Sequence, residues 1–408
     1  MEFGVSADDI IYANTSKSSS MIRHSQQAGV DLMTFDNEEE LYKMARVFPD
    51  ARLVVRIKAD DSKSVFKFSD KFGATVREAM ALIDLAKKLN LNVVGVSFHV
   101  GSSCESLLPF YQAIQDAKLL FAYGQNLNFN MQILDLGGGF PGSSFNTKLT
   151  FEQIADTISR ALDEMFPPNM VEGLRIIAEP GRYYGESSMT LITRVIAKKE
   201  LIYSDEKIAH NRQQINQNNL LRCPAYHVAA PAIHQDSNFD DESSDDSNGK
   251  KKESDNIDYT RGMMYYLNDG VYGSFNSTIL NHWPVHPEGY HSARDVTTSP
   301  PATSAASPYI QTVIWGPTCT SMDVICKSIL MPELNVDDVV VFRNLGAYSV
   351  AIATCFNGFP LSTLKYQLNG QTLAALKCLP GWPVLKQMLI NEQCGQRKSP
   401  ESVEKSTT

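Results

Sequence analysis

The chain has 408 residues, of which 43% are hydrophobic and 20% are charged. This balance is typical of a globular protein and excludes wholesale disorder. The 37 Lys and Arg residues against 46 Asp and Glu residues give a net charge of -9. Non-specific nucleic-acid binding needs clustered cations, so we predict no nucleic-acid partner. No apolar run approaches the roughly 18 residues of a membrane span, so we predict no membrane partner either.

The cysteines and the amino terminus indicate the compartment. The seven cysteines are scattered, and no two of them have Cys-x-x-Cys spacing. This pattern argues against a disulfide framework and against structural zinc, and we predict no metal site. The amino terminus is acidic where a secretory signal would be basic and then apolar. We therefore predict a cytoplasmic protein.

The first half of the chain alternates short apolar runs with stretches of helical spacing. The runs are nearly continuous in apolar character, as buried parallel strands are. They lie at 9–14, 31–35, 52–57, 93–100, 131–136 and 175–178. Between them, Asn37 precedes three glutamates as a helix cap does, residues 74–89 have an apolar face, and Thr150 with Gln153 forms a capping-box pattern. Strands alternating with helices predict an α/β fold with a parallel sheet.

About six strand–helix units end near Tyr184. A (β/α)₈ barrel needs eight units, whereas a doubly wound open sheet accepts six. The pattern alone leaves both architectures open.

The second half has a different rhythm. Strand-like runs lie at 189–196, 200–203, 263–267, 310–315, 337–342 and 350–355, with few helical patterns between them. Two polar stretches, near 210–262 and 292–308, have a composition that cannot bury a core, so we predict disordered insertions there. We predict a first domain over 1–185, a C-terminal β domain over 186–390 and a polar tail over 391–408.

Polar and glycine residues follow several of the predicted strands of the first half. Ligands bind at the carboxyl ends of the strands in barrels and open α/β sheets. The residues at those ends are Arg56, His99, Ser102, Gly137, Gly138, Gly139, Glu179, Gly181 and Arg182. Taken singly, a triple glycine is more often a tight turn and a lone histidine more often a structural residue. Their occurrence at successive strand ends predicts that they converge on one rim.

The chemistry of this set suits pyridoxal phosphate. Glycine turns and an arginine can hold a phosphate, and a flat imidazole can stack on a ring. A carboxylate beside the pyridine nitrogen keeps that nitrogen protonated, which makes the ring an electron sink. In the second half, Cys319 follows Gly-Pro-Thr, a turn that could present its thiol as a proton donor. A single cysteine is, however, more often a small buried hydrophobe.

These motifs resemble those of the eukaryotic ornithine decarboxylase family, the group IV pyridoxal-phosphate decarboxylases with an alanine-racemase-like fold. The likeness extends from about residue 9 to about residue 361, outside the two insertions. It rests on IYAN, MTFD, VVRIKADDSKS, KFGA, GVSFHVGS, LDLGGGFPG, RIIAEPGRYY, NDGVYGSFN, WGPTC, GAY and FNGF. The resemblance implies an incomplete (β/α)₈ TIM-type barrel followed by a C-terminal β domain.

The resemblance also implies roles for particular residues. His99 would stack on the pyridine ring, Glu179 would hold its nitrogen, and Arg56 would lie beside the cofactor. Cys319 would donate the proton from across a dimer interface. The phosphate would be held by Ser102, Gly137, Gly138, Gly139, Gly181, Arg182 and Tyr348. The positions that would contact substrate are Asn281, Thr320 and Asp323, the last also matching a pair with Lys71 that bridges two subunits.

The implied function is decarboxylation of L-ornithine to putrescine in polyamine biosynthesis, by a homodimer with shared active sites. A segment at about 17–44 would correspond to the family's antizyme-binding segment.

Two features depart from the family pattern. The cofactor-bearing lysine belongs to a strand that would precede IYAN and has no counterpart in this sequence, because Lys17 and Lys43 lie in other elements. Asn281 and Thr320 stand where the family has aspartates for the distal ammonium of ornithine, and an unpaired buried ammonium costs several kcal/mol. A catalytically inactive regulator resembling antizyme inhibitor, or a decarboxylase with another substrate, is therefore the alternative prediction.

Overall fold

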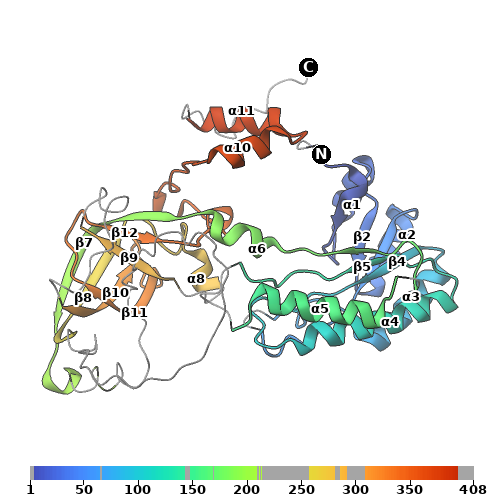
Figure 1. The fold of residues 1–408 in the computed structure, drawn as a ribbon, viewed down its shortest axis with the longest axis horizontal. Helices are drawn as coiled ribbons and strands as arrows, with labels where there is room; N and C mark the ends of the chain where they lie inside the picture. The colour runs from blue at the N-terminus through green and yellow to red at the C-terminus, as the bar shows by residue number, and fades with distance from the viewer. Residues whose placement is uncertain are drawn as a thin grey trace, which may run out of the picture. The chain divides into compact units, whose positions relative to one another are not determined.

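The computed structural model describes residues 4–64, 67–142, 148–168, 170–208, 211, 213, 257–280, 285–291 and 308–393. Most of the two predicted insertions lies outside these residues. The chain forms two compact units (Figure 1). The first contains the described parts of 1–140, 149–180 and 363–408, and the second contains those of 141–148 and 181–362.

The first unit is built on a sheet of six strands in the order β1-β2-β3-β4-β5-β6. Every neighbouring pair is parallel. The strands are β1 (Ile11–Tyr12), β2 (Leu32–Phe35), β3 (Arg52–Arg56), β4 (Asn92–Ser97), β5 (Ile133–Asp135) and β6 (Arg175–Ile177). The helices between them are α1 (Ser19–Gln27), α2 (Glu38–Val47), α3 (Val76–Lys88), α4 (Leu108–Asn126) and α5 (Phe151–Met165). The predicted α/β class is confirmed, although α1 and α4 were not predicted.

The sheet is curled around an apolar layer. One residue from each strand contributes to this layer: Ile11, Leu32, Val54, Val94, Ile133 and Ile177. This layer lines the face of the sheet that turns inward when parallel strands curl as in a barrel. The strand order also follows the chain without reversal, whereas a doubly wound sheet reverses at a switch point. The structure therefore selects the barrel-type alternative, with six of the eight strands that a closed barrel has.

The helix ends follow the predicted capping chemistry. The side chain of Asn37 accepts a hydrogen bond from the Glu40 N–H at 2.9 Å at the start of α2. Thr150 and Gln153 form a capping box at the start of α5, as predicted, and Thr75 with Glu78 forms another at the start of α3. Helix α3 buries the predicted apolar face, composed of Ala79, Leu82, Ile83 and Ala86. These caps satisfy N–H groups that have no partner within the helix.

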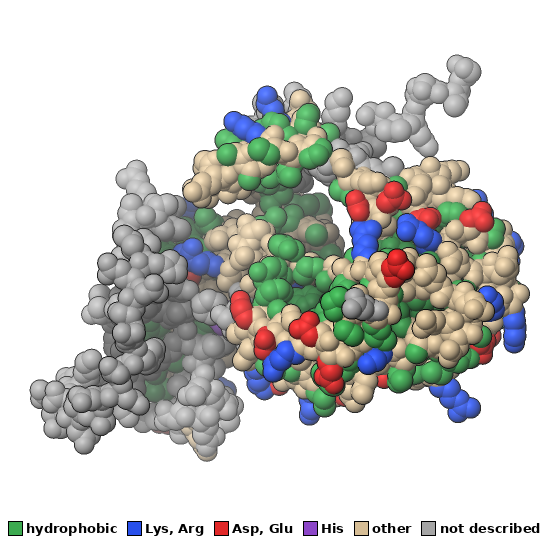
Figure 2. Space-filling model, turned by 45° about the vertical axis from the view of Figure 1, so that its right-hand side comes forward, with side chains coloured by type: hydrophobic (Ala, Val, Ile, Leu, Met, Phe, Trp, Pro, Cys, Tyr) green, Lys and Arg blue, Asp and Glu red, His purple; other side chains and the backbone are tan. Residues whose placement is uncertain are grey.

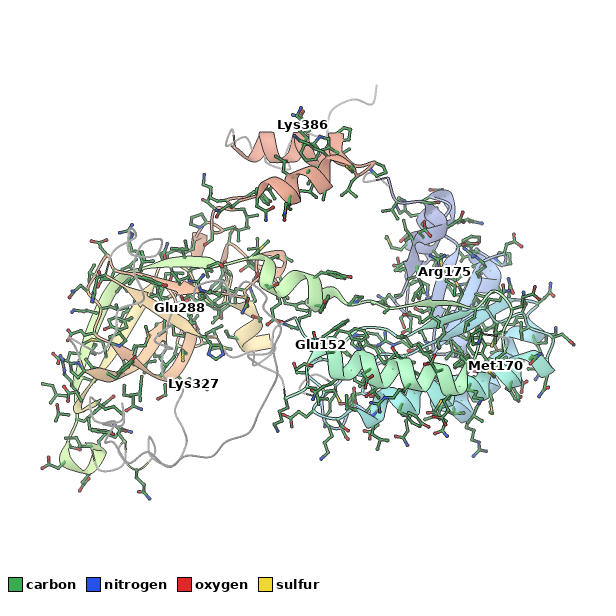
Figure 3. The ribbon with its side chains drawn as sticks, in the orientation of Figure 1. Glu152, Met170, Arg175, Glu288, Lys327 and Lys386 are labelled. Carbon is green, nitrogen blue, oxygen red and sulfur yellow. The ribbon has the colours of Figure 1, made fainter. Side chains whose placement is uncertain are left out.

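Strand β6 differs from the prediction of a buried strand. Its Ile176 is 41% exposed, and Arg175 is exposed as well. The reason is that β6 lies at the end of the described sheet and pairs with β5 alone. At its start lies Arg175, which Figure 3 labels. Its guanidinium contacts the carboxylate of Asp9, just before β1, at 2.9 Å. The two outer strands of the curled sheet thus approach each other at their amino ends.

The second unit is a mixed sheet in the order β11-β10-β8-β7-β12-β9. Its only parallel pair in the described sheet is β10 with β8. The strands are β7 (Leu191–Ile202), β8 (Ile257–Leu267), β9 (Pro287–Tyr290), β10 (Tyr309–Trp315), β11 (Val324–Pro332) and β12 (Val339–Phe342). Its core includes the fully buried Phe275 and Phe342, whose rings meet edge to face. The predicted C-terminal β architecture is confirmed.

Several predicted boundaries in this half were wrong. The runs at 189–196 and 200–203 form one continuous strand, β7, and residues 257–262 of the predicted insertion belong to β8. The predicted strand at 350–355 contains only the short helix η5 (Val350–Ile352) and is largely exposed. Strands β9 and β11 were missed. Residues 363–393 carry helices α10 (Gly370–Lys377) and α11 (Trp382–Gln393), and they belong to the first unit rather than to the β unit.

Two general features of the described residues bear on function. None of their helices is long and apolar enough to cross a membrane. They also contain no cluster of three His, Cys, Asp or Glu side chains placed to hold a metal ion. On the face of the first unit seen in Figure 2, acidic and basic side chains are interspersed.

Candidate cofactor site

The loops that follow β4, β5 and β6 are joined by backbone hydrogen bonds. The Phe98 N–H donates to the Asp135 carbonyl at 3.1 Å, and the Glu179 N–H donates to the Gly137 carbonyl at 2.7 Å. These bonds continue the strand pairing past the ends of the strands. The structure therefore brings the predicted residues His99, Gly137 and Glu179 together at the carboxyl end of the sheet.

The triple glycine lets these loops approach more closely than any other residue would allow. A Cβ at Gly137 would lie 1.9 Å from the Phe98 carbonyl oxygen, and one at Gly138 would lie 2.7 Å from His99 Nε2. A Cβ at Gly139 would lie 2.1 Å from a backbone oxygen of the β4 loop. Gly137 and Gly139 also have φ angles of +62° and +102°, which favour glycine. The predicted tight turn is thus confirmed beside the imidazole, where Gly137 and Gly138 are buried and Gly139 is half-buried.

His99 is held as a neutral ring. Its Nδ1 accepts a hydrogen bond from the Gly101 N–H at 3.0 Å, so the ring proton is on Nε2. Burial, assisted by the charge of Arg56, lowers the pKa of His99 to about 4. The Phe68 ring meets the imidazole edge to face, with centroids 4.8 Å apart. At neutral pH the site therefore presents a fixed, flat and uncharged imidazole.

Arg56 brings a cation to the same end of the sheet. It is the last residue of β3, and its guanidinium lies over the Phe72 ring at 4.8 Å from the centroid. Burial lowers the pKa of Arg56, while the nearby carboxylates of Glu179, Asp36 and Asp135 favour the charged form. Arginine remains charged across the physiological range. Its positive charge therefore partly offsets the carboxylates around it.

Asp135 is a site residue that sequence reasoning missed. It is fully buried at the end of β5, and its Oδ1 accepts a hydrogen bond from the Gly137 N–H at 2.9 Å. Burial and the adjacent Glu179 carboxylate raise the pKa of Asp135 to about 8. A usable signal was present in the sequence: an aspartate inside an apolar strand run is rare unless it has a partner.

Strand alternation explains why these charges point inward. Residues two apart on a strand share a face. Arg56 and Asp135 come two residues after Val54 and Ile133, which belong to the inner apolar layer. Glu179 follows the inner residue Ile177 by the same interval. The apolar layer thus ends in a charged layer at the carboxyl ends of the strands.

The loop after β4 adds two serines. Ser102, a predicted phosphate ligand, is half-buried, and Ser103 is buried in a left-handed conformation with φ of 54°. The hydroxyl of Ser103 has no hydrogen-bond partner among the described residues. A buried hydroxyl without a partner costs free energy, so this loop retains capacity to bind a polar group.

Other predicted residues lie in the second unit. Arg182 is buried in the short helix α6 (Gly181–Gly185), and its guanidinium lies over the Tyr348 ring at 5.1 Å from the centroid. Burial lowers the pKa of Arg182, while the Glu186 carboxylate favours its charged form. A Cβ at Gly181 would meet nothing within 4 Å, so the space beside it is open. The structure therefore brings Arg182 and Tyr348 together as an arginine–aromatic pair.

Cys319 is exposed on a loop that Asp323 holds in shape. The Cys319 Sγ lies 3.6 Å from Asn357 Oδ1. Asp323 accepts hydrogen bonds from the Val271 N–H at 2.8 Å, and from the Thr318 N–H at 2.9 Å and hydroxyl at 2.6 Å. The thiol is therefore accessible, on a turn fixed by a buried carboxylate.

These contacts change the interpretation of Asp323. The residue is only 1% exposed, and both carboxylate oxygens accept bonds from its own chain. Within the chain Asp323 therefore holds the loops, and its contacts with substrate and with Lys71 of a second copy stay predictions. Thr320 accepts a bond from the Met322 N–H at 3.2 Å, whereas Asn281 lies outside the described residues.

Comparisons with known proteins identify the family to which this chain is similar. Residues 1–186 match the pyridoxal binding domain of pyridoxal-dependent decarboxylases, and residues 247–346 match their C-terminal sheet domain. Ornithine decarboxylase of Cricetulus griseus is 39% identical over 386 residues, which cover 94% of this chain and 70% of that protein. Antizyme inhibitor 2 of Xenopus laevis is 38% identical over 378 residues, 93% of this chain and 70% of that protein.

A solved structure shares the fold. The arginine decarboxylase of Paramecium bursaria Chlorella virus, solved bound to agmatine, superposes with a TM-score of 0.65. It is 28% identical, and the match covers 87% of this chain and 77% of that one. The chain belongs to the ornithine decarboxylase family of pyridoxal-dependent decarboxylases.

Proposed function

We propose that this protein is an ornithine decarboxylase, which removes the carboxyl group of L-ornithine to give putrescine with pyridoxal phosphate as cofactor. The observation that carries the proposal is the convergence of His99, the triple glycine and Glu179 at the carboxyl ends of β4, β5 and β6. When bound, the cofactor supplies an electron sink for the pair of electrons left on the substrate carbon.

The residues of this site fit that cofactor. The half-buried Gly139 carries no side chain beside His99, and the Ser103 hydroxyl is buried without a partner in the described structure. His99 is neutral and flat, which suits stacking on a pyridine ring, because a cation there would oppose a protonated pyridine nitrogen. Glu179 would accept a hydrogen bond from that nitrogen.

The phosphate contacts have two sources of support. The backbone of Gly137, Gly138 and Gly139 and the side chain of Ser102 belong to the loops described above. Gly181, Arg182 and Tyr348 retain their predicted phosphate role through the family motifs that carry them. Arg56 would lie beside the cofactor, where its charge offsets that of the Glu179, Asp36 and Asp135 carboxylates.

Cys319 would donate the proton that replaces the lost carboxyl group. Its thiol is exposed, so a second copy of the chain could present it to the site. We therefore include a homodimer with shared sites in the proposal. A mixed dimer tests it: combining a Cys319→Ala copy with a Glu179→Ala copy should restore one working site per dimer. Mixtures as inactive as either parent would contradict sharing.

The cofactor test comes first. Purified protein should bind pyridoxal phosphate in equilibrium dialysis, and Glu179→Ala and His99→Ala should weaken binding, whereas Arg160→Ala on the exposed face of α5 should not. Carbon dioxide release from carboxyl-labelled L-ornithine, L-lysine and L-arginine then defines the substrate, with ornithine expected to be fastest. Lack of cofactor binding, or preference for another amino acid, would contradict the proposal.

A second candidate function has a specific observation in its favour. The chain resembles an antizyme inhibitor nearly as closely as the decarboxylases, and Thr320 stands where the family has an aspartate. An inactive regulator that binds antizyme through about residues 17–44 would explain both facts. Capture of antizyme by protein that neither binds pyridoxal phosphate nor releases carbon dioxide would favour this function.

We also place the protein in the cytoplasm, since its five described cysteines are free thiols.

A further inference from the structure

The carboxylates of Asp135 and Glu179 lie side by side at the inner rim of the sheet. Their strands, β5 and β6, are parallel neighbours, and Asp135 pairs in register with Ile177, two residues before Glu179. Gly137 connects both residues, because its N–H donates to Asp135 Oδ1 at 2.9 Å and its carbonyl accepts from the Glu179 N–H at 2.7 Å. The backbone therefore holds the two residues next to each other.

The second oxygen of Asp135 has an unusual environment. Asp135 Oδ2 is buried, and no N–H or O–H donor of the described residues reaches it. The Glu179 carboxylate is the nearby side chain that acts on Asp135 by its charge and as a hydrogen-bond partner, and an ionised carboxylate can only accept. Two such oxygens attract each other only when a proton lies between them. Like charges repel most strongly where burial removes the solvent, as it does at Asp135, whereas Glu179 is exposed.

We propose that Asp135 is a positioning residue that shares one proton with Glu179, so that the pair carries a single negative charge and Glu179 is held toward the pyridine nitrogen. This inference rests on the proposed function for its purpose and on the described geometry for its existence. Asp135 touches neither substrate nor cofactor in this arrangement; it acts through Glu179.

The charges around the pair agree with a single proton. Glu179 and Arg56 are the charged groups that act on Asp135, and Asp36 faces Arg56 from the end of β2. His99 is neutral, so it contributes no second cation. With one shared proton, the cation of Arg56 faces one negative charge on the pair instead of two. The raised pKa of Asp135, about 8, has burial as its main cause and the Glu179 charge as its next.

The shared proton would leave the pair with one free acceptor oxygen for the one proton on the pyridine nitrogen. A pyridine nitrogen that carries one proton needs one acceptor. The Asp135 O–H donates to one oxygen of Glu179 and leaves the other free to accept from the pyridine nitrogen. The carboxyl proton also fixes the rotation of the Glu179 side chain, which lies past the end of its strand.

Variants of Asp135 separate positioning from packing. Asp135→Asn keeps the shape and donates an N–H to Glu179 at every pH, whereas Asp135→Ala removes the donor and leaves the Gly137 N–H without its acceptor. Losing a hydrogen bond to a charged group costs roughly 10- to 100-fold in affinity. We therefore expect Asp135→Ala to bind pyridoxal phosphate about 10- to 100-fold more weakly near pH 7, and Asp135→Asn to bind within about threefold of the wild type.

The decisive readout is the pH profile. Between about pH 6 and pH 9 the wild-type affinity should fall as the shared proton is lost, while Asp135→Asn should lack this fall, because its amide cannot ionise. Ionisation of the cofactor affects both proteins equally and cancels in the comparison. The matched control is Asp116→Asn, which removes a half-buried carboxyl of α4 whose raised pKa has burial as its cause. That variant should keep the wild-type profile. Identical profiles for wild type and Asp135→Asn would overturn the proposal.

A measurement without cofactor keeps the two proposals distinguishable. Infrared difference spectra of wild type against Asp135→Asn should show the carbonyl stretch of one protonated carboxyl near pH 7, and this band should disappear as the pH rises past about 8. Its absence would refute the shared proton even if the cofactor binds. If the band is present in a protein that binds no cofactor, the proposed function would be refuted while the shared-proton proposal would stand.

Discussion

Lys17 provides the sharpest stability prediction. Its ammonium is fully buried, forms an ion pair with Glu40 at 2.8 Å, and donates to the Asn14 and Thr34 carbonyls at 3.0 and 2.6 Å. Burial lowers the pKa of Lys17, but three acceptors favour the charged form. The Lys17 amine thus links the loop after β1 to strand β2 and helix α2.

Replacing Lys17 by Met should remove this connection. Breaking a buried ion pair costs up to about 3–5 kcal/mol, and Glu40 would then keep only the partly exposed Lys43 as its counter-charge. Against a typical total of about 5–15 kcal/mol, this is a large loss. With a urea slope of about 2–3 kcal/mol per molar, the midpoint for the first unit should fall by about 1–2 M. Hydrogen exchange of β1, β2 and α2, measured by mass spectrometry, should accelerate together.

Two further variants define the controls. Lys43 contacts the same Glu40 at 2.6 Å but is 24% exposed, so Lys43→Met should cost about 1 kcal/mol or less. The double variant Lys17→Met with Glu40→Leu should be more stable than Lys17→Met alone, since an apolar pair can replace a buried ion pair at little net cost. A loss below about 1 kcal/mol in Lys17→Met, or a double variant weaker than the single one, would refute this reasoning.

Three other predictions follow from the described contacts. The pKa of His99 is about 4 in the folded protein, below its unfolded value of 6.5. The unfolded chain therefore takes up the proton first, and the free energy of unfolding should fall as the pH drops from 6.5 towards 4. In urea titrations, His99→Gln should make the free energy of unfolding less dependent on pH over this range. A Cβ at Gly138 would lie 2.7 Å from His99 Nε2, so Gly138→Ala should weaken pyridoxal phosphate binding in equilibrium dialysis by at least about tenfold. A Cβ at Gly181 would meet nothing within 4 Å, so Gly181→Ala should leave the unfolding midpoint unchanged. If Gly138→Ala and Gly181→Ala changed the unfolding midpoint equally, the steric argument would be contradicted. Asp323→Ala should destabilise the second unit by about 3 kcal/mol in a thermal melt, because one buried donor (the Val271 N–H) and two half-buried donors (the Thr318 N–H and hydroxyl) lose their acceptor. An unchanged melting temperature would show that these bonds contribute little.

The sequence predicted the first unit well because its signals are local. Apolar runs and caps such as Asn37 and Thr150 depend on neighbours in the chain, and they marked the positions of strands and helices. Barrel and open sheet could not be separated in this way, because both use the same local units and differ in long-range strand order. The exposure of β6 has the same origin, since an edge position depends on which strands pair.

The site was predicted in part, for a related reason. His99, the glycines and Glu179 follow strands, and the rule that ligands bind at strand ends brought them together. Asp135 was missed because it lies inside a strand, where an apolar run obscures a single carboxylate. The sequence motif shows the identity of Asp323, whereas its burial against Val271 and Thr318 depends on the folding of two distant loops and could not be predicted.

The close approach of the β4 and β5 loops has a consequence for how this site can change. Gly138 leaves space for His99, so neither position can be enlarged without altering the other. Gly137 likewise depends on the course of the backbone at Phe98. Mutational drift at this rim should therefore be correlated: across natural variants these positions should either persist together or be lost together, and a library that randomises them one at a time would recover few active members.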